Sequence, residues 1–257
     1  MLDDHAFIRF SRQIMLDEVG EAGQATLAKL RVLQIGLGGL GCAAAQALLA
    51  AGVGVVVAAD DDEVELSNLP RQGLYRLQDV GCSKSEAAHA ALSEGRAAGR
   101  LRTHRVRVDA LWLAREVPLV DVVLDCSDNM PTRQAVNAAC VAAGKPLVSA
   151  AVAGWRGQLM SFVPGGGCYH CQFPVSQHDE AGSCRTLGII SPLPALAGQW
   201  QATQVLRIGL QRAADRAGLA ACATMVRCDL WQGQWQVLQP ASDPDCPVCG
   251  GGQQWGR

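Results

Sequence analysis

Residues 31–60 read RVLQIGLGGLGCAAAQALLAAGVGVVVAAD, and this segment gives the strongest indication of the fold. It predicts a buried strand, a glycine-rich turn, an alanine-rich helix and a second buried strand. Gly36, Gly38 and Gly41 form a G-x-G-x-x-G motif between the first strand and the helix. Glycines there allow a tight turn and a close approach of backbone N–H groups to a phosphate. Asp60 ends the second strand about 20 residues after the motif, where an acid that binds ribose is expected.

Strand and helix patterns continue to alternate beyond this unit. We expect helices over residues 83–94 and 132–143, and strands over 104–108, 121–125 and 146–150. Because these strands are apolar throughout, they indicate a doubly wound, Rossmann-like parallel sheet that helices cover on both faces.

The C-terminal part follows a different pattern. Residues 158–163 alternate like an antiparallel strand, 165–183 are irregular and polar, 194–212 predict a long helix, and 225–239 predict a hairpin. We therefore expect an α/β fold with a mostly parallel sheet and an antiparallel C-terminal addition, in a single domain. The expected parts of this domain are a helical segment at 1–30, a nucleotide-binding half at 31–150 and a second half at 151–257.

The composition argues against several classes of protein. The chain has 257 residues and a formal net charge of −2, so no global charge attracts nucleic acid or a membrane. The longest apolar stretch is broken by glycines and favours a buried helix and strand over a membrane span. Eleven cysteines without a recognisable export signal favour a cytoplasmic protein. In that compartment cysteines are metal ligands, reactive thiols or core residues.

Polar residues crowd the segment that follows Asp60. Residues 60–63 are four consecutive acids, and Ser67-Asn68-Leu-Pro-Arg71-Gln72 adds hydroxyl, amide and guanidinium groups. Taken alone, the glycine motif favours NAD, and an NAD-dependent oxidoreductase remains an alternative. A nicotinamide needs an apolar pocket, however, whereas the polar and charged groups of this segment suit a site where a nucleophile attacks a phosphate.

These segments together resemble the ThiF/MoeB family, bacterial relatives of the ubiquitin-activating enzymes. The resemblance is carried by Arg9-Phe-Ser-Arg12-Gln, residues 36–41, Asp60, Ser67-Asn68-Leu-x-Arg71-Gln72, Lys84, Asp125-Cys-Ser-Asp128-Asn129 and the cysteines described below. It implies ATP-dependent adenylation of the C-terminal glycine of a ubiquitin-like sulfur carrier with a Gly-Gly tail, with release of pyrophosphate. It also implies a homodimer, and a carrier-binding role for the second half of the chain.

The resemblance assigns roles to individual residues. It implies nucleotide binding by Gly36, Gly38, Gly39, Gly41, Asp60, Asp62, Ser67, Asn68, Arg71, Lys84, Asp128 and Asn129. A carboxylate is already ionised and needs no general base, so catalysis would come from positioning and positive charge. Arg12, Arg71 and Lys84 would neutralise phosphate charge, with Arg12 reaching across the dimer interface. Asp128 would bind Mg²⁺, which prefers carboxylate and phosphate oxygens.

Each of these assignments has a simpler alternative. Lys84 could be a solvated lysine in the first turn of its helix, and Arg71 could be an ordinary surface arginine. Asp128 or Asn129 could cap the helix that Pro131 helps to start. The sequence also departs from the family at Pro70, where glutamine is usual, and proline removes one backbone donor from a loop that faces phosphate.

The cysteines fall into three groups. Cys168, Cys171, Cys246 and Cys249 form two C-x-x-C pairs and predict a structural Zn²⁺ site, because four thiolates leave no open position. Two redox-active pairs are the alternative, and His170 is a poor substitute ligand. Cys42, Cys126, Cys140, Cys222 and Cys228 lie in apolar segments and are predicted core residues, whereas Cys82 is expected to be exposed.

Cys184 lies in a polar segment beside Arg185, which would stabilise a thiolate. The resemblance gives it a part in sulfur transfer after adenylation, and an inert exposed thiol is the alternative. Sulfur would come from a separate donor protein. Residues 60–62, Cys184-Arg-Thr and the Cys246–Cys249 ending favour a ThiS-type carrier of thiamine synthesis over the molybdopterin synthase small subunit of the MoeB branch. A non-catalytic docking protein with the same fold is less consistent with the presence of Arg71, Lys84 and Asp128.

Overall fold

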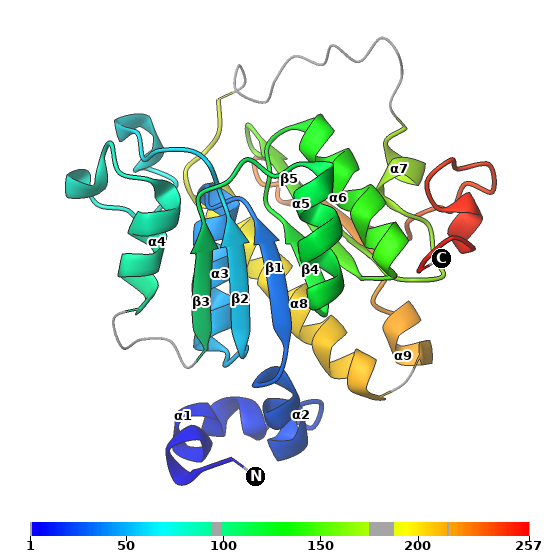
Figure 1. Ribbon diagram of the computed structural model, residues 1–257, viewed down its shortest axis with the longest axis horizontal. Coiled ribbons are helices and arrows are strands. Elements are labelled where there is room, and N and C mark those ends of the chain that lie inside the picture. The colour runs from blue at the N-terminus through cyan, green and yellow to red at the C-terminus, as the bar shows by residue number, and fades with distance from the viewer. Residues whose placement is uncertain (1, 94–98, 175–187, 215, 257) are drawn as a thin grey trace.

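The computed structural model describes residues 2–93, 99–174, 188–214 and 216–256. Its centre is one eight-stranded sheet in the order β3-β2-β1-β4-β5-β6-β7-β8 (Figure 1). Five strands pair in parallel: β1 (Arg31–Ile35), β2 (Val55–Ala59), β3 (Arg100–His104), β4 (Val122–Asp125) and β5 (Leu147–Ala153). Three strands continue the sheet in antiparallel pairs: β6 (Arg156–Phe162), β7 (Thr224–Asp229) and β8 (Gln234–Leu238). The predicted mixed α/β sheet, with its antiparallel C-terminal addition, is confirmed.

Helices cover both faces of the sheet, as Figure 1 shows. One face carries α3 (Gly39–Ala50), α4 (Lys84–Ser93) and α8 (Pro192–Ala214), and the other carries α5 (Ala110–Glu116) and α6 (Met130–Ala143). The remaining helices are α1 (Asp4–Ile14), α2 (Gly20–Leu27), α7 (Tyr169–Gln172) and α9 (Arg216–Ala220). Short 3-10 turns span Leu66–Asn68, Leu77–Asp79, Val117–Leu119 and Gly250–Gly252.

The strands are apolar throughout because both of their faces are buried. Successive side chains of a strand point to opposite faces of the sheet. Val32 accordingly packs in the cluster under α3 and α8, while the next residue, Leu33, packs in the cluster under α5 and α6. Both side chains are fully buried.

The structure corrects the predicted secondary structure in three places. The strand predicted at 104–108 is β3 at Arg100–His104, because β3 pairs with β2 and this pairing ends where Ala59 meets His104. Residues 105–108 form a loop instead. The helix α5 was not predicted; Asp109 caps it by accepting a hydrogen bond from the Trp112 N–H at 2.8 Å. The short α7 likewise interrupts a stretch that was expected to be irregular.

The parallel strands place their carboxyl ends at one end of the sheet, where ligands bind in folds of this type. The helices α1 and α2 lie at the opposite end, below the start of β1 (Figure 1). None of the helices in the described ranges combines the length and apolar character needed to cross a bilayer.

A tight contact fixes the glycine motif to β1. The Gln34 side chain donates hydrogen bonds from Nε2 to the carbonyl oxygens of Gly36 and Gly41, at 3.0 Å each. A Cβ at Gly41 would collide with the Gly36 carbonyl and would lie 2.9 Å from Gln34 Nε2. The helix start can therefore approach the strand this closely only with glycine at position 41.

We predict that Gly41→Ala lowers the free energy of unfolding by about 1–3 kcal/mol, as expected when a packed site is overfilled. Gly73→Ala is the matched control, because a Cβ there meets nothing within 4 Å. Urea denaturation measures both variants. Equal stabilities for the two would show that the contact at Gly41 imposes no constraint.

Candidate active site

A cavity of about 1000 Å³ lies at the carboxyl ends of β1, β2 and β4. It is lined by the glycine loop, the loops after β2 and β4, and the start of α4. Most of the predicted nucleotide-binding residues line it: Gly36, Gly38, Gly39, Asp60, Asp62, Ser67, Asn68, Arg71, Lys84, Asp128 and Asn129. Gly41 does not line the cavity; it lies farther along α3 and packs against β1. The fold thus gathers the predicted set, which is spread over about 90 residues of sequence, in one place.

Asp60 holds the glycine loop in position. Its carboxylate accepts hydrogen bonds from the backbone N–H groups of Leu37, at 2.6 Å, and Asp62, at 2.9 Å. Only 9% of Asp60 is exposed, and this burial raises the pKa of its carboxyl group above the usual value. Gly36 adopts a φ of +96°, which glycine tolerates and other residues rarely adopt. Asp60 therefore has a structural role that the sequence did not reveal, beside its predicted role toward ribose.

Lys84 is a buried cation, so the alternative of a solvated lysine is wrong. Its side chain is 7% exposed and its Nζ lies 2.7 Å from Asp62 Oδ2. The Lys84 N–H also donates to the Asp62 carbonyl at 3.0 Å, which joins the start of α4 to the segment after β2. A cation held in this way costs little to reorganise when an anion enters the cavity.

The segment from Ser67 to Gln72 forms one wall of the cavity. Arg71 donates from Nη1 to the Ser67 carbonyl at 2.7 Å, so its guanidinium lies along this wall. Gln72 is 3% exposed, and its Oε1 has no hydrogen-bond partner within the described residues. A buried acceptor without a partner is costly, and a bound ligand would satisfy it. Pro70 also lines the cavity, and its carbonyl accepts a hydrogen bond from the Ser191 hydroxyl.

Asp128 and Asn129 lie in the loop between β4 and α6, and the structure separates the roles that the sequence left open for them. Asn129 is the N-cap of α6, and its Oδ1 accepts a hydrogen bond from the Thr132 N–H at 3.0 Å. Asp128 is exposed and lines the cavity. Because Asn129 caps the helix, Asp128 is not required for capping.

Three further side chains support or line the cavity, and sequence reasoning missed them. Arg107 lines it from the loop after β3, a segment that was taken for a strand. Arg133 is 7% exposed and donates from Nη2 to the carbonyls of Ser127, at 2.7 Å, and Ala150, at 3.1 Å. Tyr75 donates from its hydroxyl to the Leu37 carbonyl at 2.8 Å. Only Arg133 could have been found from the sequence, because it lies in the first turns of a helix that starts at the carboxyl end of the sheet.

Two predicted catalytic residues are not brought to the cavity. Arg12 is exposed on α1, at the opposite end of the sheet, and does not line the cavity of its own chain. Its predicted reach across a dimer interface remains a prediction. Cys184 lies outside the described residues.

The four cysteines of the C-x-x-C pairs converge, although the pairs are far apart in sequence. Their Sγ atoms all lie within 4.8 Å of one another. The individual separations include 3.8 Å between Cys168 and Cys246 and 3.5 Å between Cys171 and Cys249. The His170 ring is not part of the cluster: its Nδ1 lies 3.2 Å from Gln134 Oε1. The cluster joins α7 to the C-terminal segment and offers four sulfur ligands.

The remaining described cysteines behave as predicted. Burial is complete or nearly so for Cys42, Cys126, Cys140, Cys222 and Cys228, and Cys82 is exposed. None of the described cysteines forms a disulfide.

The chain is similar to known proteins over nearly its whole length. A sequence model described as the ThiF family matches residues 10–248. The chain belongs to the ThiF family. The family resemblance seen in the sequence motifs is therefore confirmed.

Individual relatives cover nearly the whole chain. It is 41% identical over 253 residues to the sulfur carrier protein ThiS adenylyltransferase of Escherichia coli, covering 97% of this chain and 98% of that protein. It is 39% identical over 252 residues to the SAMP-activating enzyme E1 of Haloferax volcanii, covering 98% and 92%. The crystal structure of Escherichia coli MccB has the same fold, with a TM-score of 0.78 at 23% identity over 94% of this chain and 72% of MccB.

We predict that Asn129→Ala lowers the free energy of unfolding by about 1 kcal/mol, the usual cost of losing an N-cap. Asn129→Asp keeps an acceptor at this position and serves as the conservative control. Asp128→Ala is expected to change stability by less than about 0.5 kcal/mol. Thermal and urea unfolding measure all three variants, and a larger loss for Asp128→Ala than for Asn129→Ala would reverse the assignment.

Proposed function

We propose that this ThiF-family protein uses ATP to adenylate the C-terminal glycine of a ubiquitin-like sulfur carrier and releases pyrophosphate. The observation that carries the proposal is the cavity at the carboxyl ends of the strands, with the buried Lys84 and the Asp60-braced glycine loop. Near full-length similarity to a ThiS adenylyltransferase supports a ThiS-type carrier of thiamine synthesis. The molybdopterin synthase small subunit is the alternative carrier.

The proposed reaction joins two anions. The carrier's terminal carboxylate attacks the α-phosphorus of ATP, a P–O bond forms, and the bond to the leaving pyrophosphate breaks. No proton has to be removed from the attacking group, because a carboxylate is ionised at neutral pH. The barrier therefore comes from repulsion between the two anions and from the negative charge that builds up on the phosphate oxygens. The Lys84 ammonium and the Arg71 guanidinium would offset both. We further propose that Arg12 of a second subunit adds a third cation in a homodimer.

We assign Mg²⁺ to Asp128 on the chemistry of the available carboxylates. Asp60 already accepts two backbone hydrogen bonds and Asp62 pairs with Lys84. Asp128 is exposed at the cavity, and its Oδ1 accepts a long hydrogen bond of 3.4 Å from the neighbouring Asn129 side chain. A carboxylate of this kind, together with phosphate oxygens and waters, is the ligand set that Mg²⁺ prefers. When bound, the ion would lower the negative charge of the triphosphate.

The alternative of an NAD-dependent oxidoreductase is less consistent with the lining of this cavity. Acids and cations from the segments after β2 and β4 surround the region beyond the glycine loop. The deciding experiment supplies purified protein, ATP and Mg²⁺ with a ThiS-type or a molybdopterin-type carrier. Pyrophosphate exchange that requires the ThiS-type carrier supports the proposal. Binding of NAD without ATP turnover would overturn it.

We propose that the four-cysteine cluster binds a structural Zn²⁺. The sulfur atoms are close enough to share one ion, and three of the four residues are almost fully buried. Burial raises the pKa of the Cys168 thiol, so without a cation that thiol stays protonated. A Zn²⁺ ion would replace the proton of this thiol and hold α7 to the C-terminal segment. We also propose that Cys184 takes part in the subsequent sulfur transfer, with sulfur supplied by a separate donor protein.

We predict that Lys84→Met lowers the rate of carrier-dependent pyrophosphate exchange about 10²- to 10³-fold, the typical effect of removing one preorganised charge-stabilising donor. Lys29→Met is the matched control, because Lys29 is exposed and far from the cavity in the fold. Retained activity in Lys84→Met would contradict the charge-neutralising role, and retained melting temperature would exclude misfolding as the cause of a loss.

We predict one zinc per chain by elemental analysis of the purified protein. Cys249→Ser should lose the metal and lower the melting temperature, whereas Cys82→Ser should keep both, because Cys82 is exposed and outside the cluster. Protons compete with the metal for thiolates, so zinc release by a chelator should accelerate as the pH falls. Metal-free protein with an unchanged melting temperature would overturn the assignment.

A further inference from the structure

The candidate cavity has one end to which the proposed function assigns no residue. This end is closed by the loop after β3, which contributes Val106, Arg107 and Val108 to the lining. Asp128, to which Mg²⁺ is assigned, follows β4, three strands away in the sheet order. At the usual spacing of strands these two ends of the cavity are about 14 Å apart.

The order of the strands indicates which part of a nucleotide lies at this end. In sheets of this type the phosphates lie at the glycine loop after the first strand, and the ribose lies at the acid after the second strand. The glycine loop after β1 and Asp60 after β2 occupy those two positions. β3 is the next strand in the same direction. The base of a bound nucleotide would therefore lie against residues 106–108.

Two of these residues suit a flat apolar ring. Val106 and Val108 are half-buried and pack against the core cluster beneath α5 and α6. Because the core holds them from behind, they form a firm apolar wall. A base that rests on this wall buries one of its faces and leaves the other face open to the cavity.

Arg107, between the two valines, has a guanidinium that no other group holds. The side chain is exposed and, within the described residues, makes no hydrogen bond or ion pair. The nearby Arg105 differs, because its Nη2 lies 2.9 Å from Oε1 of Glu63. Arg107 thus lines a cavity rich in acids and pairs with none of them, so its guanidinium is available to a ligand.

We propose that Arg107 binds the base of the nucleotide, with its planar guanidinium stacked on the face of the ring that is turned away from Val106 and Val108. The inference rests on the proposed function for the identity of the ligand, an adenine nucleotide. Guanidinium groups stack on nucleic-acid bases because they are flat and positively charged. The base is then held between an apolar wall and a cation, while Asp60 and the glycine loop hold the ribose and the phosphates.

The test measures binding of AMP, adenosine and tripolyphosphate by calorimetric titration, without any carrier. Arg107→Met keeps the length of the side chain but removes the flat cation. It should raise Kd for AMP and for adenosine about tenfold, the equivalent of one partly desolvated cation–π contact. Kd for tripolyphosphate, which has no base, should stay unchanged.

Two further variants separate stacking from simple charge attraction. Arg107→Phe keeps a flat group and should hold Kd for AMP within about threefold of the wild type. Arg107→Lys keeps only the charge and should lose affinity as Arg107→Met does. All three variants should keep the melting temperature of the wild type, because Arg107 is exposed and makes no contact that supports the fold.

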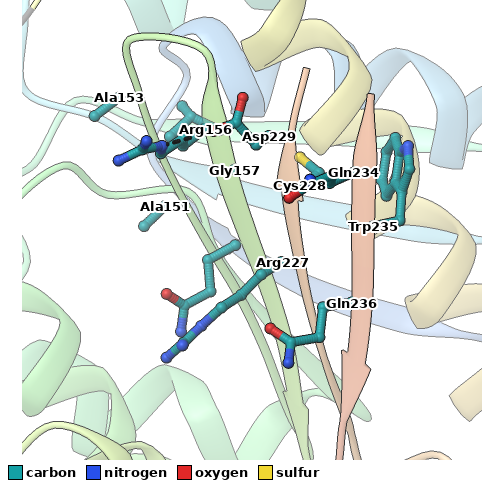
Figure 2. A pocket seen from close by; sticks show the side chains of 12 residues that line it. Ala151, Ala153, Arg156, Gly157, Arg227, Cys228, Asp229, Gln234, Trp235 and Gln236 are labelled. Carbon is teal, nitrogen blue, oxygen red and sulfur yellow. Dashed lines mark hydrogen bonds and ion pairs between the residues drawn. The ribbon is translucent and has the colours of Figure 1, made fainter. Parts of the chain in front are cut away.

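Arg227→Met is the matched control. Arg227 is an exposed arginine in a second cavity, of about 810 Å³, which lies on the antiparallel strands β6, β7 and β8 and the end of β5 (Figure 2). It does not line the candidate nucleotide cavity. Arg227→Met should therefore bind AMP and adenosine as the wild type does.

Equal affinity of the wild type and Arg107→Met for AMP would overturn the inference. The reverse order of variants, in which Arg107→Lys binds AMP normally and Arg107→Phe does not, would also overturn it, because Arg107 would then act on phosphate charge. Since the titrations need neither carrier nor turnover, they separate this inference from the proposed function. If the wild type binds AMP but catalyses no carrier-dependent pyrophosphate exchange, the proposed function fails, and weaker adenosine binding by Arg107→Met still supports stacking. A wild type that binds no adenine ligand contradicts both.

Discussion

The candidate site depends on the way one carboxylate is held. Asp60 follows β2, and its two oxygens accept hydrogen bonds from the N–H of Leu37 in the glycine loop and the N–H of Asp62 in the next segment. The side chain of Asp62 in turn holds Lys84 at the start of α4. One acid therefore sets the relative positions of the glycine loop and the cation beside it. Because Asp60 is buried and its hydrogen bonds are charge-assisted, this arrangement is stiff before any nucleotide arrives.

The supporting shell extends the same arrangement toward the rest of the sheet. Tyr75 donates to the Leu37 carbonyl from one side, and Gln34 fixes the carbonyls of Gly36 and Gly41 from the other. Arg133 joins the Ser127 carbonyl, next to Asp128, to the Ala150 carbonyl of β5. The loop after β4 is thus attached to β5, the next strand of the sheet.

The local parts of the site could be predicted from the sequence, because each depends on a short pattern. The glycine motif, the acid after β2 and the paired cysteines have fixed spacings, and the structure brings their members together. The supporting roles of Tyr75 and Gln34 could not be predicted in this way, since they depend on contacts across the fold. Arg107 was missed because Val106 and Val108 on either side suggested a strand, whereas the pairing with β2 ends at His104. Burial of Lys84 was likewise invisible, because a lysine in a first helical turn is usually solvated.

The depth at which the thiols lie divides them by reactivity. Burial raises the pKa of Cys42, to about 12, and also that of Cys126 and Cys140, so these groups remain protonated and poorly nucleophilic. In the described part of the chain, Cys82 is the only exposed cysteine. An electrophile in solution, such as an alkylating reagent or an oxidant, would therefore encounter Cys82 well before the core thiols. The fold can in this way carry many sulfur atoms while keeping most of them out of side reactions.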